Sequence, residues 1–385
     1  MARRAAGGRH RPARLRLEPP AGDRLPGGEH LAAAGRGDFR GRPLHLLAGA
    51  GALLLRRVPE DPRAAPAGRG GARRVVRPPR LPRRAAAPRL GAAAGARVDR
   101  RRLDRGGDAR DSVTPAWRAA PGGGAGELLV HPPIGGAGVA AREISVLLPP
   151  GYAPGGKHPV VYLQDGQNLF DPAIALAGGW RVPQAVSGLV AAGLRPVVVG
   201  IPSAGARRFH EYSPFRDPDL GGGGAADYLR FLLGRVRPLV ERSFAVDRSA
   251  AARLLGGSSL GAHFALWGFF AAPREFGGAL AMSPTTRFAG ESLLAFLERT
   301  AFVPGRIWLD CGSEEGRQRR RRRTGGAPRA PTAYVRRVRR LRRALERLGY
   351  VDGETLRYFE EPGGHHHEPA WARRLPAALA WLLAP

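Results

Sequence analysis

A serine flanked by glycines stands between two apolar segments in the second half of the chain. It occurs in Gly257-Ser258-Ser259-Leu260-Gly261, which fits the pattern G-x-S-x-G. In this pattern a strand turns sharply into a helix with the serine at the apex, and the small glycines let the turn close. Leu254-Leu255 can end a buried strand, and residues 262–271 form an apolar, helix-compatible run. The stretch therefore predicts a strand–turn–helix unit that presents Ser259 as a nucleophile, with an ordinary Gly/Ser turn as the alternative.

Strand-like and helix-like segments alternate from about residue 114 onward. Alternation of this kind is typical of an α/β fold, a mostly parallel central sheet with helices on both faces. We therefore expect one folded domain over residues 114–385, with its site in the loops at the carboxyl ends of the strands. The expected strands are 127–131, 144–148, 159–164, 196–201, 254–255, 278–282, 307–310 and 356–359. The expected helices are 182–192, 225–241, 334–348 and 369–383.

The first 113 residues have a different composition, dominated by Arg, Ala, Gly and Pro. They show no sustained helical or alternating pattern, so they cannot bury enough apolar surface to offset their chain entropy. We expect this low-complexity basic region, residues 1–113, to be disordered. A basic arm, a degraded accessory domain and a misframed translation of GC-rich DNA remain open as its interpretations.

The net charge of +30 is concentrated in two segments. Residues 1–110 contain 27 arginines and nine acidic residues, and residues 317–343 contain 13 arginines and no acidic residue. The remaining charges nearly cancel. Lys157 is the one lysine of the chain, so nearly every basic residue is arginine, and a biased codon composition explains the excess better than nucleic-acid binding does. No stretch is long enough to span a membrane, and the single cysteine, Cys311, excludes an internal disulfide. We expect a cytoplasmic protein, unless an upstream start site adds a signal peptide.

A serine hydroxyl needs a base to remove its proton, and the base needs a carboxylate to orient it. In α/β-hydrolase architectures the order along the chain is serine, acid, histidine. Apart from His263, just inside the helix after the elbow, the histidines that follow Ser259 are His365, His366 and His367. They lie in the loop after the last expected strand, where the base is required. A bland solvated loop is one alternative, and metal binding is disfavoured because three successive imidazoles cannot all face one ion.

The acid is expected after the strand that ends at Asp310. The candidates are Asp310, Glu314 and Glu315. Asp310 lies close to the strand and can point toward the edge of the core, whereas the loop carboxylates reach a histidine across the crevice more easily. The residues alone leave this choice open.

An acyl-transfer site also needs two backbone N–H groups directed at the developing oxyanion. One is expected from Leu260, the residue after the nucleophile. The other is expected from the turn Asp165-Gly166-Gln167-Asn168, where Gly166 permits a close backbone approach and leaves the Gln167 N–H as the donor. The alternative for this turn is a common Asp-Gly turn without a role.

Several motifs together give the chain from residue 114 onward a resemblance to a known family. They are Tyr162-Leu163-Gln164-Asp165-Gly166-Gln167-Asn168-Leu169-Phe170-Asp171, Glu211-Tyr212-Ser213-Pro214, Gly257 to Gly261, Ser283-Pro284 and His366-His367-Glu368-Pro369-Ala370-Trp371. In order and spacing they resemble the putative-esterase family of α/β-hydrolases. That family includes enterochelin esterase-like enzymes (the esterase D type), feruloyl esterases, S-formylglutathione hydrolases and mycolyltransferases.

The resemblance implies a set of roles. Ser259 would be the nucleophile, His366 the base and Glu315 the acid, the last from the pattern Gly-Ser-x-Glu that ends at Glu315. Gln167 would supply the second oxyanion amide. The resemblance further implies that the side chains lining the substrate crevice are Trp180, Arg208 and Tyr212.

Three functions are compatible with these observations. The first is a serine carboxylic-ester hydrolase that acts through an acyl-enzyme on a small-molecule ester, with no cofactor and no metal. The second keeps the elbow but passes the acyl group to a sugar or an alcohol. The third is a basic anion- or nucleic-acid-binding protein on an inactive hydrolase scaffold. The sequence gives neither the acyl nor the alcohol part of the substrate, nor the oligomeric state.

Overall fold

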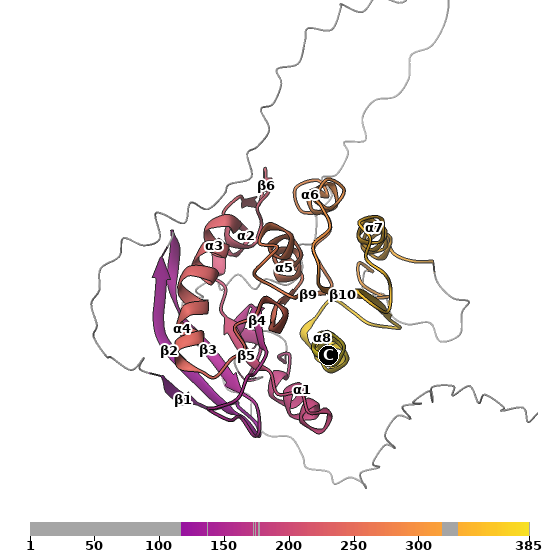
Figure 1. Cartoon of the computed structure of the whole chain (residues 1–385). Helices are drawn as coiled ribbons and strands as arrows, with labels where there is room; N and C mark the ends of the chain where they lie inside the picture. The colour runs from indigo at the N-terminus through magenta and orange to yellow at the C-terminus, as the bar shows by residue number, and fades with distance from the viewer. Residues whose placement is uncertain are drawn as a thin grey trace, which may run out of the picture. The chain divides into compact units, whose positions relative to one another are not determined.

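The computed structural model describes residues 117–384, apart from 137, 172, 174, 176–177 and 318–329. The expectation of disorder over residues 1–113 lies outside the described residues. Within them the chain forms a nine-stranded sheet with strand order β1-β2-β3-β5-β4-β8-β9-β10-β11 (Figure 1). The expected mostly parallel sheet is confirmed.

The six strands that follow β3 in this order run parallel to one another. They are β5 (Val197–Ile201), β4 (Val160–Gln164), β8 (Arg253–Ser258), β9 (Gly278–Met282), β10 (Arg306–Gly312) and β11 (Leu356–Glu361). Every residue of β4 and β5 is buried, as expected for short Val-rich runs covered on both faces. Each expected strand in this part is present. Three of them, β8, β10 and β11, are two to four residues longer than expected, and β4 and β5 begin one residue later.

The amino-terminal part of the sheet is antiparallel. It consists of β1 (Arg118–Ala120), β2 (Glu127–Gly136) and β3 (Val139–Leu148). The expected segments 127–131 and 144–148 are only the first half of β2 and the last half of β3. The two strands extend into a long hairpin in which exposed residues alternate with buried ones, so an apolar-run criterion detects only the ends that pack on the core.

Helices cover both faces of the sheet (Figure 1). One face carries α1 (Val182–Leu189) and α8 (Glu368–Leu383), whose apolar residues pack on Leu147, Val161 and Leu163. The opposite face carries α3 (Ala225–Phe231), α4 (Arg237–Ser243), α5 (Leu260–Ala271) and α7 (Ala333–Arg347), packed on Val146, Tyr162 and Val199. The alternation of side chains along each strand explains why two separate apolar clusters form.

The expected helix over 225–241 has an irregular middle. A single π-helical turn, Leu232–Val236, joins α3 to α4. Pro238 stands just after this turn and has no N–H to donate, so the regular hydrogen-bond ladder cannot continue through it. In α7, by contrast, Thr332 caps the amino end by accepting from the Val335 N–H at 3.1 Å.

Several short elements were not expected from the sequence. The expected helix 182–192 is present as α1 followed by a 3₁₀ turn, Val190–Ala192. The unexpected elements are α2 (Arg208–Tyr212), α6 (Ser292–Leu297), the small hairpin of β6 (Arg216–Asp217) and β7 (Gly221–Gly222), and the 3₁₀ turns Gly166–Asn168, Gly205–Arg207 and Ala250–Ala252. Their apolar patterns are too short to show a period.

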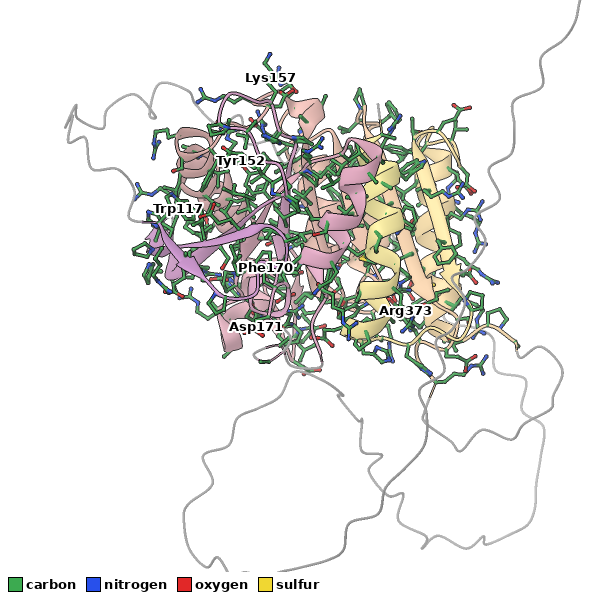
Figure 2. All side chains as sticks on the ribbon, turned by 90° about the horizontal axis from the view of Figure 1, so that it is seen from below. Trp117, Tyr152, Lys157, Phe170, Asp171 and Arg373 are labelled. Carbon is green, nitrogen blue, oxygen red and sulfur yellow. The ribbon has the colours of Figure 1, made fainter. Side chains whose placement is uncertain are left out.

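The two ends of the parallel strands can be followed in Figure 2, where Lys157 precedes β4 and Asp171 follows it. Asp171 lies at the same end as Arg373, which stands near the start of α8, and Lys157 lies at the opposite end. The loops at the Asp171 end therefore contain the residues expected to form the site. Among the described residues, none of the helices is both long and apolar enough to cross a membrane.

Candidate active site

Ser259 occupies a strained turn between β8 and α5. Its backbone angles, φ 54° and ψ −118°, lie where a side chain is rarely found, which is the geometry of a nucleophile elbow. A Cβ on Gly257 would stand 2.7 Å from the Gly261 carbonyl carbon, so the two glycines are needed for the strand and the helix to cross. The elbow expected from the sequence is confirmed as a local structure.

Three side chains from separate loops form a continuous hydrogen-bonded chain. The Ser259 Oγ lies 2.9 Å from His366 Nε2, and His366 Nδ1 lies 2.7 Å from Glu315 Oε2. Ser259 follows β8, Glu315 follows β10 and His366 follows β11, so the sheet brings together residues 107 positions apart. The His366 side chain is 36 % exposed while that of Glu315 is 1 % exposed, so the imidazole is reachable and its carboxylate partner is not.

The structure separates the three candidate acids by their contacts. Asp310 is fully buried and accepts from the Ser283 N–H at 3.1 Å and from Trp308 Nε1 at 2.8 Å, with no contact to His366. Glu314 forms an ion pair with Arg317 at 2.9 Å. Of the three, only Glu315 is recorded in contact with His366.

The electrostatic environment of the two buried carboxylates differs. Burial raises the pKa of Asp310 to about 6. Burial would also raise the pKa of Glu315, but its hydrogen bond with His366 and the neighbouring N–H and O–H donors outweigh that effect, and the pKa of Glu315 is lowered. The arrangement therefore favours Glu315 as the permanently charged partner.

His263, the other histidine near the elbow, has different surroundings. It is fully buried in α5, one turn after Ser259, and its Nδ1 lies 3.2 Å from the Thr285 carbonyl oxygen. Burial lowers the pKa of His263 to about 4, so its imidazole stays neutral. It holds the loop after β9 rather than facing the serine hydroxyl.

Two backbone N–H groups stand at the starts of helical turns that follow the neighbouring strands β8 and β4. Leu260 is the first residue of α5, and Gln167 is the second residue of the 3₁₀ turn Gly166–Asn168, positions whose N–H groups have no acceptor within their own helix. The Gln167 side chain is tied to Ser203 by two hydrogen bonds of 3.1 Å, which fixes this turn. A Cβ on Gly166 would lie 2.7 Å from the Gly200 carbonyl carbon, so the turn requires glycine there.

The side chains expected to line the crevice are mostly buried. Trp180 is 1 % exposed and packs on Trp371, and Tyr212 is fully buried. Of the three, Arg208 keeps some exposed surface, but its guanidinium forms two hydrogen bonds of 2.7 Å with the Asp165 carboxylate. Trp180 and Tyr212 therefore offer a ligand almost no surface in this structure. The motifs did not reveal this, because a motif does not show whether a side chain is buried.

Arg208 and Tyr212 instead converge on Asp165. The Tyr212 hydroxyl accepts from the Asp165 N–H at 3.1 Å, on the residue whose carboxylate Arg208 holds. Asp165 has φ 58°, a left-handed conformation that starts the Gly166–Asn168 turn. Glu211, the neighbour of Tyr212 in α2, anchors this helix further through a buried ion pair with Arg142 of β3 at 2.7 Å. These residues thus fix the turn that presents the Gln167 N–H.

Sequence reasoning missed two residues that contact the hydrogen-bonded chain. The Thr285 Oγ1 lies 3.2 Å from the Ser259 Oγ, and the Ser283 Oγ lies 2.6 Å from Glu315 Oε1. Ser283-Pro284 was among the motifs of the resemblance but carried no role. No pattern in the sequence marks Thr285.

Two further features of the site region concern metal ligands and the arginines that follow Glu315. Among the described residues, no group of three His, Cys, Asp or Glu side chains could hold a metal ion. In the run that begins at Arg317, residues 318–323 lie outside the described part, and Arg317 itself pairs with Glu314 rather than with Glu315. The carboxylate that contacts His366 is therefore not the partner of Arg317.

A mostly parallel sheet with a serine elbow after β8 and a histidine loop after its last strand defines the α/β-hydrolase class. Comparison with known proteins narrows this class. The profile of the "Putative esterase" family matches residues 140–382, so the chain belongs to that family and is a hydrolase that acts on carboxylic ester bonds. The resemblance drawn from the motifs is confirmed.

Two curated relatives align with the chain. It is 26 % identical over 251 residues to the "Uncharacterized protein YbbA" of Bacillus subtilis, covering 63 % of this chain and 92 % of that protein. It is 35 % identical over 154 residues to the "Siderophore triacetylfusarinine C esterase" of Aspergillus fumigatus, covering 38 % of this chain and 50 % of that protein. The second alignment thus spans half of the fungal enzyme.

Solved structures share the fold at low sequence identity. A ferulic acid esterase aligns with a TM-score of 0.51 and 17 % identity, over 67 % of this chain and 98 % of that chain. The enterobactin esterase FES of Shigella flexneri aligns with a TM-score of 0.51 and 18 % identity, over 70 % of this chain and 59 % of that chain. At these identities the likeness concerns the fold.

Proposed function

We propose that this chain is a serine carboxylic-ester hydrolase in which Ser259, His366 and Glu315 are the catalytic triad. The observation that carries the proposal is the unbroken set of contacts, 2.9 Å and 2.7 Å long, that starts at a strained elbow serine. A nucleophile, a base and an orienting acid in this order along the chain are what acyl transfer by serine requires.

The proposed reaction has two halves. In the first, the Ser259 Oγ bonds to the ester carbonyl carbon while its proton passes to His366 Nε2. The tetrahedral intermediate then breaks its bond to the alcohol oxygen, which takes that proton and leaves. In the second half a water gives its proton to His366, attacks the acyl-enzyme and releases the carboxylic acid, and the proton returns to Ser259.

The developing negative charge needs donors that are already in place. We assign this role to the N–H groups of Leu260 and Gln167, because both stand at the starts of helical turns, Leu260 directly after Ser259 and Gln167 after β4, the strand that pairs with β8. Arg208 and Tyr212 act through Asp165, which they hold in the conformation that begins the Gln167 turn. We therefore place them in support of the oxyanion site, whereas the resemblance had implied direct contact with substrate.

Replacement of the nucleophile tests the proposal. Ser259→Ala should abolish hydrolysis of short-chain p-nitrophenyl esters and covalent labelling by a fluorophosphonate, with the label located on Ser259 by peptide mass spectrometry. Ser187→Ala is the matched control, because its hydroxyl bonds to Pro183 in α1, away from the site. Unchanged ester hydrolysis by folded Ser259→Ala would refute the assignment.

A panel of esters addresses the substrate. A siderophore ester belongs in it because one relative is named a siderophore esterase, and a feruloyl ester because a structural neighbour is named a ferulic acid esterase. Product analysis with an added alcohol or sugar separates the hydrolase from the acyltransferase alternative, since only the latter forms a new ester in preference to the free acid.

A further inference from the structure

A second serine occupies a strained position next to the proposed acid. Ser283 follows the last residue of β9, is fully buried and has φ 48°, a left-handed conformation that is costly for a residue other than glycine. Its N–H is directed at Asp310, at 3.0 Å from the carbonyl oxygen and 3.1 Å from Oδ1. The conformation brings its hydroxyl against Glu315 on the neighbouring β10 loop.

We propose that Ser283 is a positioning residue of the active site, which together with Trp371 and Arg374 of α8 fixes the Glu315 carboxylate in the orientation that His366 requires. The proposal rests on the proposed function, because it deepens the role given there to Glu315. It assigns to the Ser283-Pro284 motif a task that the triad alone leaves unexplained.

The direction of the Ser283 hydrogen bond follows from its partners. The Ser283 Oγ lies 3.0 Å from Trp371 Nε1 and 2.9 Å from Arg374 Nη2. Indole and guanidinium nitrogens only donate, so these two bonds use both acceptor sites of the hydroxyl oxygen. The single Ser283 proton must then be donated to Glu315 Oε1, at 2.6 Å.

The contacts of Glu315 divide between its two oxygens. Oε1 accepts from the Ser283 hydroxyl at 2.6 Å and from the Gly312 N–H at 2.7 Å, while Oε2 contacts His366 Nδ1 at 2.7 Å. With Oε1 occupied by two fixed donors, the carboxylate plane is set and Oε2 is directed at the imidazole. A rotation of the carboxylate would break both Oε1 bonds.

Arg374 supplies a positive charge behind this arrangement. Its side chain is 1 % exposed and lies 3.5 Å from Asp310 Oδ1, 3.7 Å from Glu315 Oε1 and 3.8 Å from Glu361 Oε2. The Arg374 Nε and Nη1 atoms have no hydrogen-bond partner among the described residues, whereas Nη2 donates to the Ser283 Oγ. The serine hydroxyl thus connects a buried cation to the carboxylate.

Ser283→Gly is the informative variant. Glycine tolerates φ 48° without strain, so this change removes the hydroxyl while relieving the backbone. Ser283→Ala removes the same hydroxyl and keeps the strain, and both variants leave the Trp371 and Arg374 donors without this acceptor. Ser187→Ala, which removes a hydroxyl on α1, is the control.

Four readouts are compared between wild type and the three variants. They are the unfolding midpoint, kcat and KM on p-nitrophenyl butyrate, the pH profile of kcat/KM from pH 5 to 9, and the downfield ¹H resonance of the His366 Nδ1–H. The charged and titratable groups that surround Glu315 and enter the pH profile are His366, Arg374, Asp310, Cys311 and Tyr334.

We expect kcat of Ser283→Gly to fall about tenfold to a hundredfold with KM little changed, as for other residues that orient a catalytic group. The acidic limb of the pH profile, which reports protonation of the catalytic base, should be displaced by about half a unit or more, because the Glu315 carboxylate that faces His366 has lost a donor on Oε1. The downfield resonance should shift or broaden. Ser187→Ala should match the wild type in all four readouts.

Folded Ser283→Gly with a wild-type kcat, acidic limb and resonance would overturn the proposal. So would failure of both Ser283 variants to fold, which would assign the residue to stability instead. If wild type and variants alike hydrolyse no ester, the proposed function fails, but the resonance still reports whether Ser283 controls the Glu315–His366 contact. The two ideas therefore fail separately.

Discussion

Glu315→Gln is expected to move the proton of the His366 imidazole from Nδ1 to Nε2 while the ring keeps its position. Oε1 of Glu315 accepts from the Ser283 hydroxyl and from the Gly312 N–H, so an amide NH₂ group cannot occupy that position. The glutamine oxygen must take the Oε1 place, and its NH₂ must face His366 Nδ1 at 2.7 Å. The imidazole then accepts at Nδ1 and carries its proton on Nε2.

This tautomer cannot act as the base. Nε2 lies 2.9 Å from the Ser259 Oγ, and a protonated Nε2 has no lone pair to receive the serine proton. An asparagine in place of the triad aspartate of a serine protease lowers kcat about 10⁴-fold for the same reason. We expect a similar loss here, which corresponds to about 5.5 kcal/mol of activation free energy.

The assay is kcat on p-nitrophenyl butyrate at pH 7.5, with folding checked by circular dichroism. Glu314→Gln is a matched control, because it makes the same substitution one residue earlier at a carboxylate that pairs with Arg317. An ion pair of this partly exposed kind contributes about 0–1 kcal/mol, so the control should keep its activity. Activity of Glu315→Gln within tenfold of wild type would refute the reasoning about the tautomer.

Three further outcomes are expected. Tyr212→Phe leaves the buried Asp165 N–H without its acceptor. The free energy of unfolding measured in urea should fall by about 1–3 kcal/mol, and kcat should fall more than KM changes. Unchanged stability would contradict this. Gly257→Ala should prevent folding or abolish activity, because the added Cβ would stand 2.7 Å from a backbone carbon. The control is Gly188→Ala in α1. Its Cβ would have open space around it, so this variant should keep the wild-type melting temperature and activity. The pKa of Glu315 is lowered in the folded protein, so its stabilising effect is complete above its ordinary value of 4.5 and is lost as the pH falls through the folded value. The difference in unfolding free energy between wild type and Glu315→Gln should therefore shrink between pH 7 and pH 3, and a constant difference would contradict it.

The sequence was sufficient to predict the elbow and the parallel sheet around it. Short buried strands leave a strong apolar signal, and the small neighbours of Ser259 leave a specific one, because a Cβ on Gly257 would meet Gly261 directly. The order of elements also located the histidine loop. These features depend on local chain geometry, which neighbouring residues determine.

The choice of acid could not be predicted from chemistry alone. Asp310 and Glu315 are five residues apart after the same strand, and both are buried carboxylates. What separates them is the direction of the turn after Gly312, which points Glu315 at His366 and leaves Asp310 to Ser283 and Trp308. Such a difference arises from contacts between β9, β10 and α8, so the residues alone left the choice open, and only the Gly-Ser-x-Glu pattern of the resembling family favoured Glu315.

Burial was the second property that the motifs did not reveal. Tyr212 carries a polar group and stands in a family motif, which suggested an exposed role. In the structure its ring is fully buried among aromatic neighbours and its hydroxyl holds the Asp165 backbone. An aromatic residue with one polar atom serves equally well as a ligand contact or as an internal brace, and only the fold distinguishes the two.

The helix α8 has a consequence for the order in which the site is completed during synthesis. The elbow and the Gln167 turn leave the ribosome first, whereas His366 and the two α8 residues that contact Ser283 are made more than 100 residues later. Until the chain beyond β11 is made, the imidazole of His366 is not beside Ser259. In the proposed mechanism a nascent chain would therefore carry a serine without its base, until the segment from His366 through α8 takes its place.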